Sequence, residues 1–150
     1  MKTDDRAVSP VLAYVLTLGI SALLVAGLII AAGAYVDTQR EATTESELQV
    51  LGQQVSADFA AADRLARTEG ATAVSVSRDL PNRVVGSSYR IEVRSDGAGP
   101  TDPYLELSST ETDVQVTVGL TSQTPIEDAT VNGGKVVVES ENGELVIRNV

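Results

Sequence analysis

The sequence lacks cysteine, histidine and tryptophan, and it has one phenylalanine and only 11 basic residues against 21 acidic ones. Without thiols or imidazoles there can be no cysteine nucleophile, no disulfide framework, no Cys/His zinc site and no Ser-His-Asp triad. The formal net charge of −10 would repel nucleic-acid phosphates. No P-loop, G-x-G-x-x-G or G-x-S-x-G motif occurs. The sequence therefore predicts no enzyme, no small-molecule substrate and no nucleic-acid partner.

Two groups of carboxylates are the only candidates for a metal site. They are Asp96, Asp102 and Glu106 near a glycine-rich stretch, and Glu139, Glu141 and Glu144 near the C-terminus. Neither group has the spacing of an EF-hand loop, so we interpret both as solvated acidic loops. We expect no metal and no cofactor.

The excess of negative charge lies in one part of the chain. Residues 8–36 carry no charged side chain, and Lys135 is the only lysine after them. An acidic surface that prefers arginine to lysine resembles the surfaces of salt-adapted, haloarchaeal proteins. Such a surface stays soluble where salt screens the repulsion between carboxylates.

Residues 7–36 form one long uncharged run, most of it Leu, Val, Ile, Ala and Gly. About 20 such residues suffice to cross a bilayer core as a helix. Lys2 and Arg6 precede the run, whereas Arg40 after it is diluted by Asp37 and Glu41. This bias favours a cytoplasmic N-terminus and an extracellular C-terminus. The sequence predicts a single-pass protein in contact with membrane lipid.

The residues just before and inside the start of this run read Asp-Arg-Ala-Val-Ser-Pro-Val, from Asp5 to Val11. This resembles the start of archaeal, especially haloarchaeal, type IV pilins and pilin-like proteins, although the resemblance covers only about residues 4–36. It implies a leader of residues 1–7 cut by prepilin peptidase, a membrane aspartyl enzyme, with Arg6, Ala7 and Val8 at the processing site. It also implies other pilin-like subunits as partners in a surface filament. Bacterial pilins usually carry Glu as the fifth mature residue, where this chain has Leu12.

Two other interpretations remain open. A secretory signal could be cut at Ala32-Gly33-Ala34, although the apolar run exceeds the usual 7–15 residues of such a signal. A plain membrane anchor would need no cut and would hold an extracellular binding module that does not polymerise.

Ser9 and Pro10 are suited to be the N-cap and first residue of the helix. Small residues at four-residue spacing predict a face for close helix packing. They are Ala13, Thr17, Ser21, Ala22, Ala26, Gly27 and Ala31.

Residues 37–69 continue the helix with a different pattern, and Gly70 is a plausible stop. Apolar positions recur three or four residues apart, which is the helical period. They are Leu48, Leu51, Val55, Phe59, Ala62 and Ala66. This stripe predicts a seam between the helix and a head, and it places Asp58 and Asp63 on the solvent-facing side.

Residues 70–150 predict the head: about six short antiparallel strands, forming a small sandwich or a sheet packed on the helix. The expected strands are residues 72–78, 88–94, 104–108, 113–120, 135–140 and 144–149. Asn142-Gly143 is the strongest hairpin signal. The fold class is thus α+β, with a leader (1–7), a transmembrane or assembly helix (8–36), its amphipathic continuation (37–69) and an extracellular head (70–150).

Overall fold

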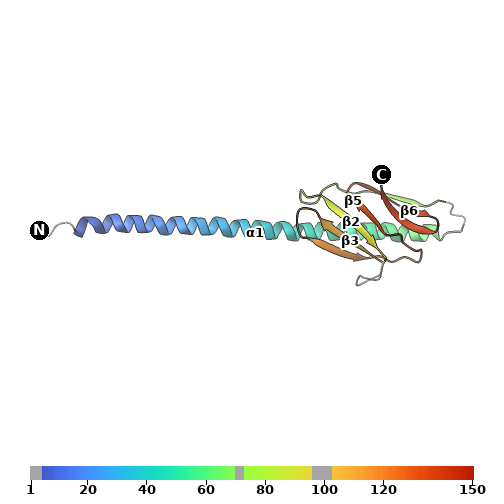
Figure 1. Ribbon diagram of the computed structural model, residues 1–150, viewed down its shortest axis with the longest axis horizontal. Helices are drawn as coiled ribbons and strands as arrows, with labels where there is room; N and C mark the ends of the chain where they lie inside the picture. Colours follow the sequence, from blue (N-terminus) through green and yellow to red (C-terminus); the bar gives the residue numbers. More distant parts are fainter. Residues whose placement is uncertain (1–4, 70–72, 96–102) are drawn as a thin grey trace. The chain divides into compact units, whose positions relative to one another are not determined.

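The computed structural model describes residues 5–69, 73–95 and 103–150, with side chains from Pro10 onward. Within these residues one long helix precedes seven strands along the chain. Figure 1 shows the ribbon coloured by sequence. The elements are α1 (Asp5–Ala66), β1 (Ser75–Asp79), β2 (Tyr89–Arg94), β3 (Tyr104–Ser109), β4 (Gln115–Gly119), β5 (Ala129–Asn132), β6 (Lys135–Glu141) and β7 (Glu144–Asn149). The predicted α+β class is confirmed.

Both ends of the helix differ from the prediction. The helix begins at Asp5, so Ser9 and Pro10 lie inside it and do not start it. Pro10 is the sixth residue of the helix, beyond the first four N–H groups that have no partner in any helix, so its missing N–H leaves one helical hydrogen bond unmade. The helix ends at Ala66, before the expected residue 69, in a tighter turn in which the Thr68 N–H donates to the Leu65 carbonyl at 3.1 Å. Gly70 lies outside the described residues.

The chain divides into two compact units, Met1–Gln39 and Arg40–Val150. We call residues 8–36 the apolar segment and Arg40–Val150 the head unit. The part of α1 from Arg40 onward therefore belongs to the same unit as the strands. The reason is its stripe, which is buried against them.

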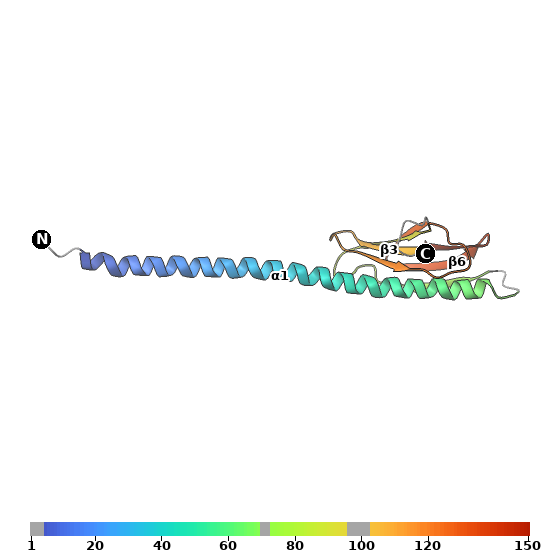
Figure 2. The ribbon, with the colours of Figure 1, turned by 90° about the horizontal axis from the view of Figure 1, so that it is seen from below.

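The strands form two antiparallel sheets, one in the order β1-β6-β7 and one in the order β4-β3-β2-β5. The Asn149 side chain links their edges, because it accepts from the Asn132 N–H and donates to the Asn132 carbonyl, both at 3.0 Å. Within the head unit, the strands lie on one side of α1 (Figure 2). The outermost strands of the two linked sheets are β1 and β4.

The strand predictions were close in position and one short in number. The expected strands match β1, β2, β3, β4, β6 and β7 with shifts of up to three residues at their ends. The missed strand is β5, whose four residues, Ala-Thr-Val-Asn, are too few to show an alternating pattern. The hairpin at Asn142-Gly143 is confirmed, and both residues have the positive φ that a two-residue turn of this kind requires.

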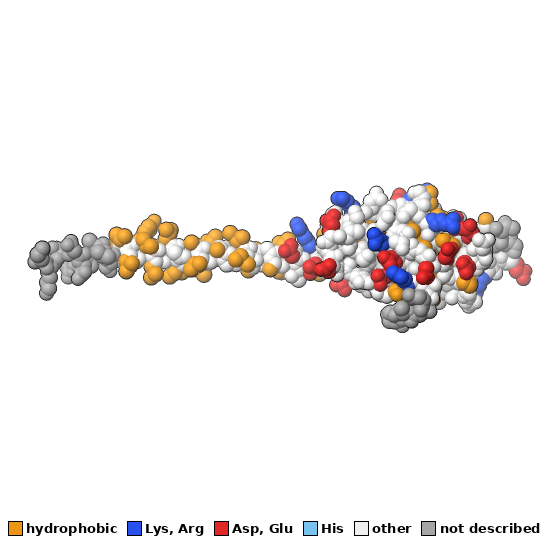
Figure 3. Space-filling model, viewed as in Figure 1, with side chains coloured by type: hydrophobic (Ala, Val, Ile, Leu, Met, Phe, Trp, Pro, Cys, Tyr) orange, Lys and Arg blue, Asp and Glu red, His pale blue; other side chains and the backbone are white. Residues whose placement is uncertain are grey.

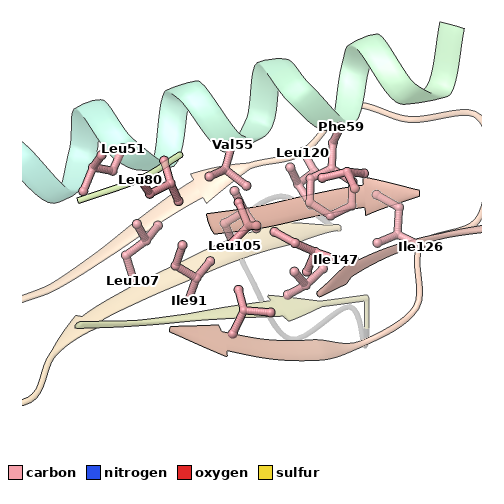
Figure 4. Close-up of a cluster of buried hydrophobic side chains, with 14 of the residues drawn as sticks. Leu51, Val55, Phe59, Leu80, Ile91, Leu105, Leu107, Leu120, Ile126 and Ile147 are labelled. Atoms are coloured by element: carbon pink, nitrogen blue, oxygen red, sulfur yellow. The ribbon is translucent and has the colours of Figure 1, made fainter. Parts of the chain in front are cut away.

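The core of the head unit lies between α1 and the strands (Figure 4). Leu48, Val55, Phe59 and Ala62 from the predicted stripe are fully buried, Leu51 is almost so, and Ala66 packs at the margin. They meet residues such as Ile91, Leu105, Leu107 and Ile147 from the strands. The alternating inward positions of the strands and the helical stripe thus fill one common core.

Candidate membrane and assembly site

The part of α1 that could cross a membrane is exposed along its whole described length. From Pro10 to Val36 every side chain is exposed, including Leu23 at 75% and Ile30 at 73%. Figure 3 shows its hydrophobic side chains without any charged one among them. Fully burying a side chain of this size is worth about 1.5–3 kcal/mol relative to water. This segment therefore requires cover from lipid or from other chains, and it is a candidate membrane span.

The backbone and the Thr17 hydroxyl of the apolar segment are suited to a bilayer. An α-helix satisfies its backbone N–H and carbonyl groups within itself, which hydrocarbon demands. The Thr17 hydroxyl donates to the Ala13 carbonyl one turn earlier at 2.8 Å. This hydroxyl needs no water either.

The small residues of the segment do not share one face of the helix. At about 100° per residue, Ala13, Thr17, Gly27 and Ala31 fall on one side, whereas Ala22 and Ala26 fall on the opposite side. Ser21 lies between them. A Cβ atom placed on Gly27 would meet nothing within 4 Å. The predicted packing face is therefore two separate sets of small positions.

The predicted processing residues lie in the first turn of α1. Arg6, Ala7 and Val8 have helical backbone conformation, and their side chains fall outside the description. The carboxylates that were considered as metal ligands do not all lie within the described residues. Asp96 and Asp102 lie outside the described residues, and Glu139 and Glu141 instead form ion pairs with Arg148.

Asp58 was predicted to face solvent, but it is a buried member of the helix–strand seam. Its side chain is 8% exposed and forms a bidentate ion pair with Arg78 of β1, in which Nη2 donates to Oδ1 at 2.6 Å. The carboxylate raises the pKa of the Arg78 guanidinium against the opposing effect of burial. The spacing of residues could have indicated that Asp58 is buried, because it lies seven residues after Leu51 and so on the same side of the helix.

Asp63 is buried at the other margin of the seam. Its Oδ1 accepts from the N–H groups of Thr124 at 2.9 Å and Gln123 at 3.2 Å, and the Ser122 hydroxyl lies 3.0 Å away. Arg67 pairs with its Oδ2 at 3.0 Å. Burial alone would raise the pKa of Asp63, but hydrogen bonds from Thr124 and Ser122 and the charge of Arg67 together lower it to about 2. Asp63 thus holds the loop that follows β4.

The two aspartates hold both outer parts of the linked sheets against the helix. Asp58 contacts β1, and Asp63 contacts the loop after β4. Near Asp58 in the sequence, the Ser56 hydroxyl donates to the Gly119 carbonyl at the end of β4 at 3.1 Å. Free sheet edges invite pairing with other chains, and these contacts tie both outermost strands to α1. In the described residues, no three His, Cys, Asp or Glu side chains gather as a metal site.

A family model matches residues 3–149 of the chain, which is nearly its whole length. The chain belongs to DUF7266, a family of unknown function. The DUF7266 match includes both the apolar segment and the head unit. No curated protein and no solved structure matches the chain significantly.

Proposed function

We propose that this protein is a pilin-like subunit of an archaeal type IV pilus-type surface filament. In this proposal the chain inserts with its N-terminus in the cytoplasm, prepilin peptidase removes residues 1–7, and subunits assemble through the apolar segment. The observation that carries the proposal is the contrast between the two units. The head unit has its own buried core, whereas every described side chain of the apolar segment is exposed. The segment must therefore find its cover outside its own chain.

The start of the helix supports a cut between Ala7 and Val8. In the uncut chain Pro10 lies in the second turn, where its missing N–H leaves the carbonyl of residue 6 without its helical donor. After the cut Pro10 would be the third residue of the helix, among the N–H groups that have no partner in any helix. Processing would thus remove the misfit at Pro10.

The charges of the leader give the cut a physical purpose. Lys2 and Arg6 hold the N-terminus at the cytoplasmic surface, since moving a basic side chain to the bilayer centre costs about 2.5 kcal/mol or more. Removing both leaves a chain whose first 29 residues, 8–36, carry no charged side chain. Such a helix can leave lipid for a bundle of like helices. Small residues on two opposite sides of it would allow close approach to more than one neighbour.

A second function is a membrane-anchored extracellular binding module that never polymerises. The observation that favours it is the head unit, which has a complete core of its own and needs the apolar segment only as a tether. This alternative requires no cut at Ala7–Val8. The two functions therefore differ in the first residue of the mature chain.

Intact-mass analysis of the membrane-extracted protein separates them. In a host that has prepilin peptidase, we expect a species that begins at Val8. Ala7→Trp should abolish this species, because a bulky side chain cannot fit where the small one lies beside the scissile bond. Ala34→Trp is the matched control and should leave processing unchanged. Full-length protein in such a host would overturn the pilin-like proposal, and a chain that begins at Tyr35 would establish a secretory signal instead.

A further inference from the structure

The two linked sheets end in β1 and β4, and among the described residues each of these strands has one edge without a strand beside it. In β1 the even-numbered residues bond to β6, since the Ser140 N–H donates to the Val74 carbonyl at 3.0 Å and the Leu80 N–H donates to the Gly134 carbonyl at 3.1 Å. In an antiparallel pair, the residues between them turn their N–H and carbonyl groups to the other edge. These outward residues of β1 are Ser75, Ser77 and Asp79.

Strand β4 has the same arrangement. The Ser109 N–H donates to the Val114 carbonyl at 3.0 Å and the Leu120 N–H donates to the Pro103 carbonyl at 2.8 Å, so the even-numbered residues bond to β3. The outward residues of β4 are Gln115, Thr117 and Gly119, and like those of β1 they are exposed. Within the described part of the chain, the one hydrogen bond to these outward backbone groups is that of the Ser56 hydroxyl to the Gly119 carbonyl. Two rows of backbone donors and acceptors are therefore available to another strand.

The two free edges lie on opposite flanks of α1. Asp58 forms its ion pair with Arg78 of β1, and Ser56 contacts Gly119 of β4. Positions two residues apart are separated by about 200° around a helix, so the two contacts leave α1 on nearly opposite sides. A contact between unlike edges is heterologous, and it can be repeated from copy to copy along a helical filament.

The two edge strands run in opposite directions within one copy. Antiparallel pairs lead from β4 through β3 and β2 to β5, so β5 runs opposite to β4. Strand β7 runs the same way as β5, because Ile126 lies beside Leu145 in a parallel bridge and Asn132 lies beside Asn149. Antiparallel pairs then lead from β7 through β6 to β1, which therefore also runs opposite to β4. In two copies that point the same way, β1 of one and β4 of the next would be antiparallel, which is the commoner pairing of strands.

The charges of the two strands permit this pairing, although the net charge of −10 makes copies of the chain repel one another. Strand β4 carries no charged residue, and β1 carries only Arg78 and Asp79, whose charges cancel. Neither strand contains the proline or lysine with which many proteins block a free edge. These edges are therefore the part of the sheets at which a second copy meets the least repulsion.

We propose that the head units of neighbouring copies pair edge to edge, with β1 of one copy antiparallel to β4 of the next and Ser77 opposite Thr117. This register overlaps the two strands over their whole length and also places Asp79 opposite the uncharged Gln115. The occupant of each free edge is thus the other edge of a second copy. The inference rests on the proposed function, in which all copies point the same way, and it names the contact between their heads.

Two half-buried valines select this register. Val76 of β1 and Val118 of β4 lie on the sheet face that packs on the core, and both are only partly buried. With Ser77 opposite Thr117, Val76 of one copy lies opposite Val118 of the next, and each covers the other. Pairs of β-branched residues directly opposite one another stabilise a sheet. A register shifted by two residues would separate the two valines and shorten the overlap.

Disulfide cross-linking tests the register, since the native chain has no cysteine to interfere. Opposite residues of an antiparallel pair have Cα atoms about 4.5–5.5 Å apart, within the range that a disulfide spans. We expect full-length protein with Ser77→Cys and Thr117→Cys to form a ladder of oxidised multimers in cells that process the leader. Ser77→Cys with Thr130→Cys is the matched control, because Thr130 is exposed on β5, away from both free edges, and it should form no ladder.

Charge variants test the same contact with a second cysteine pair, Asp79→Cys and Gln115→Cys, which the register also places opposite each other. Ser77→Lys with Thr117→Lys sets like charges opposite each other, and we expect about a fivefold loss of the ladder. Ser77→Glu with Thr117→Lys sets opposite charges there and should retain the ladder. Thermal unfolding of the head unit should be similar in both variants, since these positions are exposed in the single chain.

The outcomes distinguish this inference from the proposed function. Processing at Ala7–Val8 without a ladder from Ser77→Cys and Thr117→Cys would overturn the edge pairing and leave the pilin-like function standing. A ladder of equal yield from the control, or a dimer from Thr117→Cys alone, would also overturn the edge pairing, because the contact would then be unspecific or between like edges. A ladder from a chain that stays full-length would support the edge pairing and overturn the pilin-like function. A chain that stays full-length and forms no multimers would overturn both.

Discussion

Helix α1 contains two regions that use hydrophobic residues in opposite ways. In the apolar segment they occur on every side of the helix, and all are exposed, as Leu23 is at 75%. In the head unit most of the large ones form one stripe, and Leu48, Val55 and Phe59 there are 0% exposed, although Val50 and Leu65 lie outside the stripe at 50% exposed. A uniform distribution can be buried only by surroundings that are apolar on all sides, whereas a stripe can be buried by one sheet. The comparison teaches that the pattern, and not the amount, of hydrophobic residues decides what covers a helix.

The glycines of the two regions of α1 differ in the same way, in whether other parts of the chain surround them. A Cβ atom at Gly19, Gly27 or Gly33 would meet nothing within 4 Å. A Cβ atom at Gly52 would lie 2.7 Å from Val118 Cγ2 and 2.9 Å from Leu107 Cδ1. Gly52 therefore allows the strands to approach α1 closely, a role that the glycines of the apolar segment do not have within the chain.

The largest expected effect comes from placing a charge in each region. Phe59→Asp removes a fully buried ring and leaves an unpaired carboxylate, so we expect the head unit to lose about 4 kcal/mol or more of stability. Urea unfolding of the detergent-extracted protein, followed by circular dichroism of the strands, measures this. The matched variant Leu23→Asp should leave head stability unchanged and reduce membrane insertion. Equal head stability in both variants would contradict the contrast between the two regions.

The next largest effect is expected at Asp58, which was predicted to face solvent but is buried. Asp58→Ala leaves the Arg78 guanidinium without its partner, and we expect a loss of about 2 kcal/mol. The loss is smaller than for a fully buried pair because the Arg78 side chain is 37% exposed. Glu41→Ala, at an exposed position of the same helix, is the control and should be nearly neutral in the same unfolding assay. A neutral Asp58→Ala would mean that the ion pair does not stabilise the seam.

We expect low pH to weaken the contact between Asp63 and the loop that follows β4. Because the pKa of Asp63 in the folded state is about 2 and its ordinary value is 3.8, its contribution is present above about pH 4 and is lost as the pH falls towards 2. We expect a contribution of about 2 kcal/mol. The difference in unfolding free energy between the native chain and Asp63→Asn, measured from pH 6 to pH 2, should shrink over that interval. If this difference in unfolding free energy did not change with pH, protonation of Asp63 would not be the cause of a loss of stability in acid.

The smallest expected effect comes from replacing one glycine in each region by alanine. Gly52→Ala should destabilise the head unit by about 1–2 kcal/mol, because the clash with Val118 and Leu107 outweighs the better helix propensity of alanine. Gly27→Ala should cause no loss, since no atom of the chain opposes it. Thermal unfolding of both variants would measure this, and a more stable Gly52→Ala protein would show that β4 shifts without cost.

The same residues show which parts of the molecule sequence reasoning could reach. The stripe from Leu48 to Ala66 and the hairpin at Asn142-Gly143 were predictable, because each depends on a local period or a local turn. Asp58 and Asp63 were misplaced, because a charged residue is normally exposed and only its partner shows otherwise. That partner is a residue of β1 for Asp58 and a loop more than 50 residues away for Asp63. Strand β5 was missed because its four residues are defined by pairing with β2.

The sequence by itself determined the division of α1 into an uncharged segment and a striped one, the antiparallel strands of the head and the absence of thiol and imidazole chemistry. Each of these follows from composition or from the spacing of neighbours along the chain. Only the tertiary structure decided that two aspartates tie the outermost strands to the helix, that Gly52 is a point of close approach, and that no charged side chain of α1 between Glu47 and Arg64 is exposed. These features depend on which distant residues surround a side chain, and burial of that kind is a property of the packed fold.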